Sequence, residues 1–92
     1  MLYPISIEWE EGLTAIGIQI PDIPGAVTAA DTFEEACAAA VEVAHIMLDE
    51  IAGSGRPIPL PSSAVAHRGH PEFEGMDWGA LDVDVTAYLA ER

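Results

Sequence analysis

The chain has 92 residues, which is enough for one domain, and 50% of them are hydrophobic, so an intrinsically disordered chain is excluded. It carries 16 acidic residues, three arginines and no lysine, for a formal net charge of −13. Because nucleic-acid binding depends on Lys and Arg side chains that neutralise phosphates, this charge excludes direct binding of DNA or RNA and predicts attraction to a basic protein.

The length and the single cysteine allow three further expectations. A domain of this size is only marginally stable alone, so we expect a homo-oligomer. No apolar run approaches the roughly 18 residues that cross a bilayer, and the N-terminus lacks a signal-peptide pattern. Cys37 has no second cysteine to pair with and lies in the apolar arc of a helical pattern, so we predict a core residue, not a nucleophile, in a cytoplasmic protein.

Three strands are predicted in the first 30 residues. Residues 2–9 alternate apolar and polar side chains with the period of a half-buried strand. A short turn at 10–12 leads to a second strand over 13–20, and the proline-bounded turn 21–25 leads to a third over 26–30. Strands this close in sequence are expected to form an antiparallel meander.

One long helix is predicted over residues 33–52. Thr32 and Glu35 have the spacing of a capping box, in which the threonine hydroxyl accepts a hydrogen bond from the glutamate amide. Apolar side chains fill one wide arc, while acidic side chains and His45 fill the opposite arc, so we expect an exposed His45. The pattern ends at Gly53.

The rest of the chain is predicted as a long connection over 56–75, with one helical turn near 62–67, followed by a last strand over 77–88. The face of this strand that points away from the helix carries Trp78, Asp82, Asp84 and Tyr88. The predicted class is therefore α+β: a two-layer βββαβ domain with one long helix on one face of a mostly antiparallel sheet. No predicted element covers the other face of the sheet.

Four segments, in this order, resemble the N-terminal domain of HicB antitoxins: YPISIE (3–8), IPDIPG (20–25), ADTFEEA (30–36) and GRPIPLPS (55–62). Residues 78–85 suit the closing strand of that family. The resemblance implies a partially degraded ribonuclease-H-like fold and a role in neutralising HicA, a small basic toxin that cleaves mRNA. Full-length HicB proteins usually continue into a DNA-binding domain, so we expect one HicB-like domain over 1–92 without a C-terminal DNA-binding domain.

The charge and the resemblance lead separately to one function. We expect an antitoxin-like binding protein that covers the RNA-binding and active surface of a basic HicA-type toxin. The candidate partner-binding residues are Asp22, Trp78, Asp82 and Asp84. The aromatic residues Trp78 and Tyr88 suggest an interface, although the proline-rich loop is an equally good cover for them. An alternative is a solitary oligomeric module that binds another protein or a small ligand.

Catalysis is not expected, and neither a metal nor a cofactor is predicted. Asp82 and Asp84, with neighbouring acids, leave open a Mg²⁺ site of the kind a metal-dependent ribonuclease-H-like hydrolase uses. Their i, i+2 spacing is weak evidence, and the basic groups that would hold RNA are almost absent. His67, His70 and Glu72 leave a zinc site open, but loop histidines without a metal are the simpler interpretation.

Overall fold

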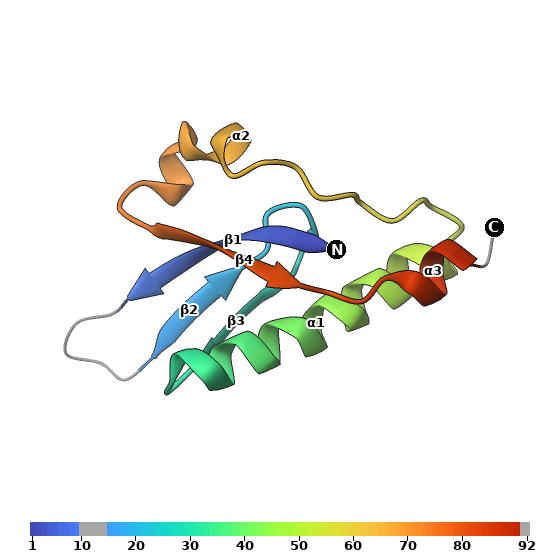
Figure 1. The fold of residues 1–92 in the computed structure, drawn as a ribbon, viewed down its shortest axis with the longest axis horizontal. Helices are drawn as coiled ribbons and strands as arrows, with labels where there is room; N and C mark the ends of the chain where they lie inside the picture. Colours follow the sequence, from blue (N-terminus) through green and yellow to red (C-terminus); the bar gives the residue numbers. More distant parts are fainter. Residues whose placement is uncertain (10–14, 91–92) are drawn as a thin grey trace.

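The computed structural model describes residues 1–9 and 15–90. The elements are β1 (Leu2–Trp9), β2 (Ile16–Gln19), β3 (Val27–Ala30), α1 (Phe33–Gly53), α2 (Val65–Arg68), the 3-10 turn η1 (Pro71–Phe73), β4 (Asp77–Asp82) and α3 (Thr86–Ala90) (Figure 1). The strands form one sheet in the order β3-β2-β1-β4, in which neighbouring strands are antiparallel. The predicted α+β class is confirmed. The predicted turn at 10–12 and the first two residues of the predicted second strand lie outside the described residues.

Strand β1 lies in the middle of the sheet, and its register with its two neighbours sorts the side chains onto two faces. Directly opposed residues of an antiparallel pair point to the same face. The helix face, which α1 covers, carries Tyr3, Ile5, Ile7, Ile18 and Leu81. The opposite side, called the outer face below, carries Pro4, Ser6, Gln19, Trp78 and Asp82.

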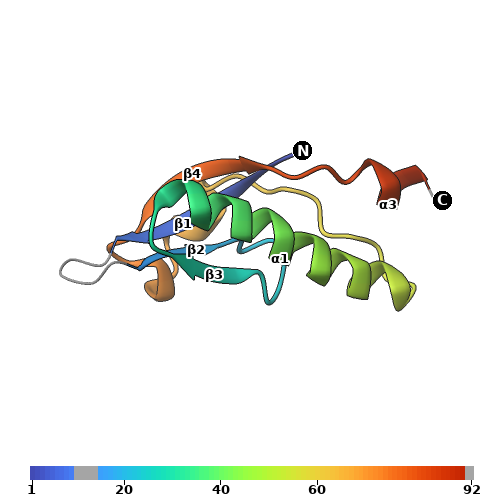
Figure 2. The same ribbon diagram turned by 90° about the horizontal axis from the view of Figure 1, so that it is seen from below.

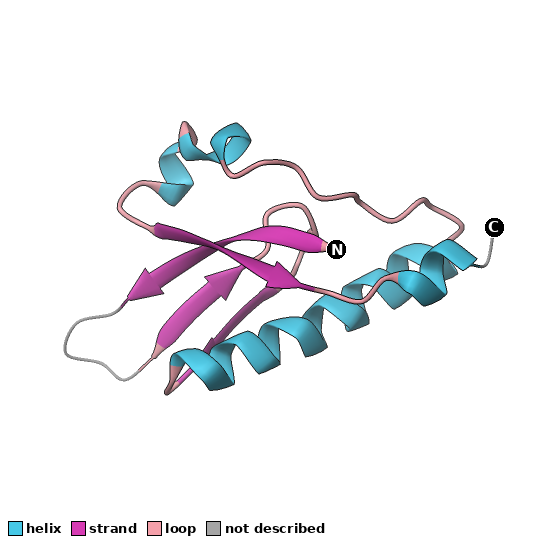
Figure 3. Ribbon diagram, viewed as in Figure 1, coloured by secondary structure: helices cyan, strands magenta, loops and turns pink. Residues whose placement is uncertain are grey.

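Helix α1, the long helix in Figure 3, begins at Phe33, where the capping box predicts. Thr32 is extended, and its Oγ1 accepts a hydrogen bond from the Glu35 amide at 3.1 Å. The side of the helix that packs on the sheet buries Ala36, Ala40, Ala44 and Leu48. Three alanines at a spacing of four residues allow the helix to approach the sheet closely. No helix in the described part of the chain has the length and apolarity needed to cross a bilayer.

The outer face is partly covered by the chain itself, which corrects the expectation that no element of this chain covers it. Figure 2 shows α1 on one side of the sheet and the segment containing α2 and η1 on the other. Phe73 of η1 is buried, and its ring centroid lies 5.3 Å from that of Trp78. The single predicted helical turn is therefore followed by a second one, and together they place aromatic rings against the sheet.

The last strand is shorter than predicted, and this changes the position of Tyr88. Strand β4 ends at Asp82, and Thr86–Ala90 forms α3. The Asp84 Oδ1 accepts a hydrogen bond from the Thr86 amide at 3.0 Å, which is a helix-capping contact. The prediction that Tyr88 lies on the sheet face away from the helix is therefore wrong, because its hydroxyl donates to Asp49 Oδ1 of α1 at 2.7 Å.

Candidate partner-binding surface

Asp22 lies in the turn between β2 and β3 and is engaged within the chain. Its Oδ2 accepts a hydrogen bond from the Ser62 amide at 2.8 Å, and its Oδ1 accepts from the Ser62 hydroxyl at 2.7 Å. His67 Nε2 lies 3.2 Å from the same Oδ1, and only 10% of the Asp22 side chain is exposed. We call Asp22, Ser62 and His67 the loop latch, because they fasten the proline-rich loop to the turn.

The proline-rich loop is also fastened at a second point, next to the latch. The Tyr3 hydroxyl donates a hydrogen bond to the Pro59 carbonyl oxygen at 2.7 Å. Burial and the nearby Asp22 carboxylate raise the pKa of Tyr3, so the phenol stays protonated and remains a donor. Asp22 therefore holds the loop in place, and little of its side chain is exposed on the surface.

The loop latch contains the residue types of a Ser-His-Asp triad but not its geometry. In a triad, one ring nitrogen of the histidine contacts the serine and the other contacts the aspartate. Here Nε2 of His67 approaches both Ser62 Oγ, at 2.8 Å, and Asp22 Oδ1. The Ser62 hydroxyl already donates to Asp22, so its proton is directed at the carboxylate and not at the imidazole of His67. This arrangement fastens a loop and does not activate a nucleophile.

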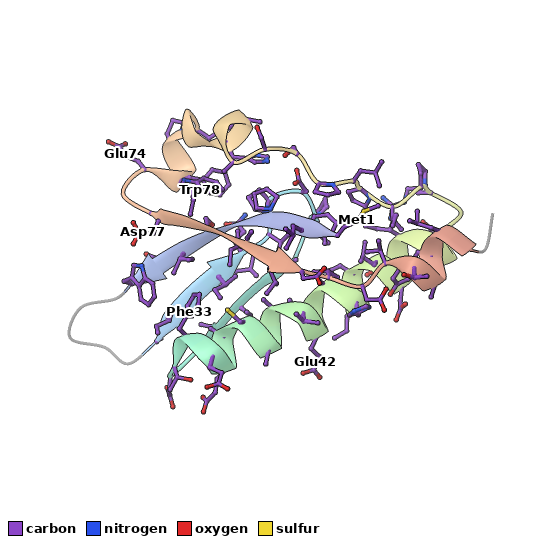
Figure 4. All side chains as sticks on the ribbon, in the orientation of Figure 1. Met1, Phe33, Glu42, Glu74, Asp77 and Trp78 are labelled. Carbon is purple, nitrogen blue, oxygen red and sulfur yellow. The ribbon has the colours of Figure 1, made fainter. Side chains whose placement is uncertain are left out.

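Trp78 lies on the outer face, as predicted, within an aromatic cluster that also contains His67, His70 and Phe73. Its ring is stacked on His67 with centroids 6.1 Å apart and meets Phe73 edge to face. Figure 4 shows the Trp78 side chain between β4 and the α2–η1 segment. Trp78 is thus half-buried under local cover.

Asp82 and Asp84 follow each other at i, i+2, but each has a different role in the structure. Asp82 is 78% exposed, and its Oδ1 lies 3.1 Å from the amino-terminal nitrogen of Met1. Asp84 caps α3, and the Thr86 backbone amide, followed by its side chain, holds the Asp84 pKa below its usual value. The side chain of Glu72, the third residue of the possible zinc site, lies outside the described part of the structure. Among the side chains that the structure describes, no group of three or more His, Cys, Asp or Glu could hold a metal.

Two features escaped the sequence reasoning, and the first is a groove between α1 and α3. It has a volume of about 420 Å³, and its walls include His45, Asp49, Asp84 and Tyr88. The His45 Nδ1 lies 3.3 Å from the Tyr88 hydroxyl, so His45 is half-buried and not exposed as expected. The assignment of Tyr88 to a strand hid the groove, although Asp84 two residues before Thr86 is a helix-capping signal.

The second is an exposed aromatic pair at the start of α1. Trp9 and Phe33 are 50% and 40% exposed, and their ring centroids lie 5.5 Å apart. The indole Nε1 of Trp9 donates to Asp77 Oδ2 at 2.6 Å. The alternation of β1 places Trp9 on the helix face correctly, but it cannot show that the sheet extends beyond the helix there.

Cys37 is half-buried and packs against the core, which confirms its predicted place. Burial raises the pKa of its thiol, so the reactive thiolate is disfavoured. On the far side of α1, away from the sheet, the exposed acidic side chains are Glu34, Glu35, Glu42, Asp49 and Glu50. Figure 4 shows Glu42 pointing away from the sheet. The chain thus carries acidic groups on both of its broad sides.

Comparison with known proteins gives the family. A family model described as the HicB-like antitoxin of bacterial toxin-antitoxin systems matches residues 3–92. An uncharacterised 14.9 kDa protein of Haemophilus phage HP1 is 30% identical over 92 residues, which cover 99% of this chain and 67% of the phage protein. Antitoxin HicB 2 of Photorhabdus laumondii is 40% identical over 63 residues, which cover 68% of this chain and 44% of that protein. The chain therefore spans only part of the length of these relatives.

Solved structures agree with this assignment. The N-terminal domain of the Burkholderia pseudomallei antitoxin HicB has a TM-score of 0.72 at 23% identity, with 92% of this chain and 100% of that domain covered. A chain of the HicA3 and HicB3 toxin-antitoxin complex has a TM-score of 0.73 at 26% identity, with 91% of this chain and 99% of that chain covered. The sequence motifs, the fold and these matches lead to one conclusion: the chain belongs to the HicB-like antitoxin family of bacterial toxin-antitoxin systems.

Proposed function

We propose that this chain neutralises a basic HicA-like toxin by covering the toxin's RNA-binding and active surface. The observation that carries the proposal is the net charge of −13, with no lysine, on a compact domain. Such a charge attracts a basic protein and repels RNA, so the chain competes with RNA for the same positive surface. The structural likeness to a chain of a toxin-antitoxin complex supports this partner.

The proposed contact surface is the outer face together with the adjoining start of α3. Asp82 is 78% exposed and supplies charge, and Asp84, which is also exposed, lies two residues further along the chain. The exposed part of Trp78 adds an aromatic contact beside them. Asp22 is a positioning residue in this proposal, because its carboxylate holds the loop that borders the surface.

The proposed mechanism contains no catalytic step, metal, cofactor or direct DNA contact by residues 1–92. The proposed unit is a cytoplasmic homo-oligomer. Seven large apolar side chains remain exposed among the described residues and support self-association; the most exposed are Leu2 at 64%, Leu60 at 61% and Val27 at 59%. A monomer in sedimentation experiments would contradict this part of the proposal.

The test mixes the chain with a basic HicA-like toxin. We expect the chain to stop the toxin from cleaving mRNA, and we expect calorimetry to show a complex that weakens as salt is added. A complex that is absent, or equally stable at low and high salt, would contradict the electrostatic mechanism. Cleavage of RNA by the purified chain in Mg²⁺ would contradict the absence of catalysis.

A further inference from the structure

Ser6 is an unusual residue at the centre of the outer face. It lies in the middle of β1 and is 1% exposed. Its hydroxyl has no hydrogen-bond partner within the part of the chain that the structure describes. Buried polar groups are nearly always satisfied, and leaving one unsatisfied costs stability that an apolar residue would not cost. A buried hydroxyl without a partner among the described residues points to a partner outside the chain.

A small hollow of about 60 Å³ lies beside this serine. Its lining includes Ser6, Glu8, Gly17, Gln19, Val27 and Met76. Glu8 stands opposite Gly17 in the β1–β2 register. A Cβ atom on Gly17 would lie 3.7 Å from Glu8 Oε2, so the carboxylate lies directly above the glycine. The volume corresponds to about two water molecules at roughly 30 Å³ each.

The chemistry of the lining selects the kind of group that the hollow can take. The hydroxyl of Ser6, the amide oxygen of Gln19 and the carboxylate of Glu8 are hydrogen-bond acceptors, while Val27 and Met76 form an apolar wall. A lysine side chain presents three N–H donors at the end of an aliphatic stem, which matches both parts. The flexible thioether of Met76 lets that wall adjust around the stem.

Charge favours a cation from another molecule. The two ion pairs in the described residues are Met1–Asp82 and His67–Asp22, and neither uses Glu8. The chain contains no lysine, and residues 10–14 contain no basic residue. We propose that the hollow beside Ser6 receives the ammonium group of a lysine side chain from the basic partner; the identity of this partner rests on the proposed function. A planar arginine fork with five donors is a poorer match for a hollow of this volume.

Gly17 offers a way to fill the hollow without disturbing the fold. The Cβ added by Gly17→Ala meets its neighbours at ordinary contact distances of 3.6 Å or more. The first experiment titrates the isotope-labelled chain with n-butylammonium, an analogue of a lysine side chain, and follows the backbone amides by NMR. Tetramethylammonium is the control, because it carries the same charge and has no N–H donor. Both cations are compared at equal ionic strength.

We expect n-butylammonium to produce saturable shifts at Ser6, Gly17, Gln19 and Val27, and tetramethylammonium to produce none there. The shifts are lost in Gly17→Ala and require several-fold more ligand in Ser6→Ala. Ser6→Ala keeps or raises the melting temperature, because it removes an unsatisfied hydroxyl. Equal shifts with both cations, or shifts that persist in Gly17→Ala, would overturn the proposal, as would a Ser6→Ala variant that binds n-butylammonium as the wild type does.

The toxin supplies the second experiment and separates this inference from the proposed function. We expect Gly17→Ala to weaken the complex with the toxin roughly tenfold, as loss of a buried charge-assisted contact does. A toxin that binds wild type and Gly17→Ala equally well leaves the proposed function intact and overturns the lysine site. If the toxin binds neither protein, the proposed function fails, and the n-butylammonium titration alone decides whether the hollow binds an ammonium group.

Discussion

The two faces of the sheet are built in different ways. On the helix face, Ile5 and Ile18 of the sheet are 1% exposed and pack in one core with the alanine row and Leu48 of α1. On the outer face, a carboxylate latch and four aromatic rings take the place of a second apolar layer. Ser6 is buried there without a partner among the described residues. Apolar packing is therefore concentrated on one face, and the other face carries the polar groups to which we assign recognition of the partner.

The largest expected effect comes from the helix face. Leu48→Ala removes a side chain that is fully buried against the sheet and leaves a cavity, so it is expected to lower the free energy of unfolding by about 3 kcal/mol. Ile46→Ala is the matched control on the same helix, because Ile46 is 55% exposed. Urea denaturation compares the two. Similar losses in both variants would show that α1 does not concentrate stability on its inner side.

Asp22→Ala is expected to destabilise the outer face and to leave the helix face intact. It leaves Ser62 and His67 without their common acceptor and is expected to cost about 2 kcal/mol. Hydrogen exchange should show loss of protection at the Ser62 amide, while amides of β1 and β2 still exchange with the free energy of global unfolding. Asp82→Ala, at a carboxylate that is 78% exposed, is the control and should leave stability nearly unchanged. An Asp22→Ala variant as stable as this control would refute the latch.

A smaller effect is expected at the edge of the helix face, where α3 packs on α1. Tyr88→Phe removes the hydroxyl that donates to Asp49 and keeps the ring, so it is expected to cost about 1 kcal/mol. The lost stability should appear as faster exchange of amides in α3. Tyr3→Phe removes the other well-bonded tyrosine hydroxyl and should instead loosen the loop at Pro59. If both variants affect the same segment, the two regions are not independent.

The smallest expected effect is a pH dependence of α3. Hydrogen bonds from Thr86 lower the pKa of Asp84 below its usual 3.8, so the folded form favours the ionised carboxylate. The resulting stabilisation is complete above the unfolded pKa and is lost as the pH falls through the lower folded value. In an NMR titration, the Thr86 amide should lose its protection from exchange when the pH is lowered below 3.8. Asp84→Asn should remove this pH-dependent loss of protection. If the loss persists in the variant, another acidic residue causes it.

Local sequence signals are sufficient to predict where β1 and α1 begin. The alternation from Leu2 to Trp9 and the capping box at Thr32 predict both starting points correctly, because each depends on residues only a few positions apart. The end of the last strand was missed because Val83 and Val85 stay buried beyond β4 and continue the alternation. Val83 still exchanges backbone hydrogen bonds with Met1, and the buried segment that follows it has the same apolar alternation as a strand.

The surface was less predictable than the fold for a physical reason. Asp22 and Ser62 are 40 residues apart, and no local pattern shows that the carboxylate of one fastens the loop of the other. The motifs IPDIPG and GRPIPLPS were recognised separately, but their contact depends on the finished sheet. Trp78 was placed on the correct face from the period of the strand, whereas its cover by Phe73 and His67 required the folded connection.

We propose that the outer face, together with the adjoining start of α3, binds a basic partner through its acidic groups, and a comparison of two acidic surfaces tests this proposal. Affinity for the basic toxin is measured over a salt series for the wild type, for Asp82→Asn with Asp84→Asn, and for Glu42→Gln on the far side of α1. We expect the double variant to bind roughly tenfold more weakly and with a shallower salt dependence, and Glu42→Gln to bind as the wild type does. Equal losses in both variants, or a wild-type affinity that does not change with salt, would contradict this proposal.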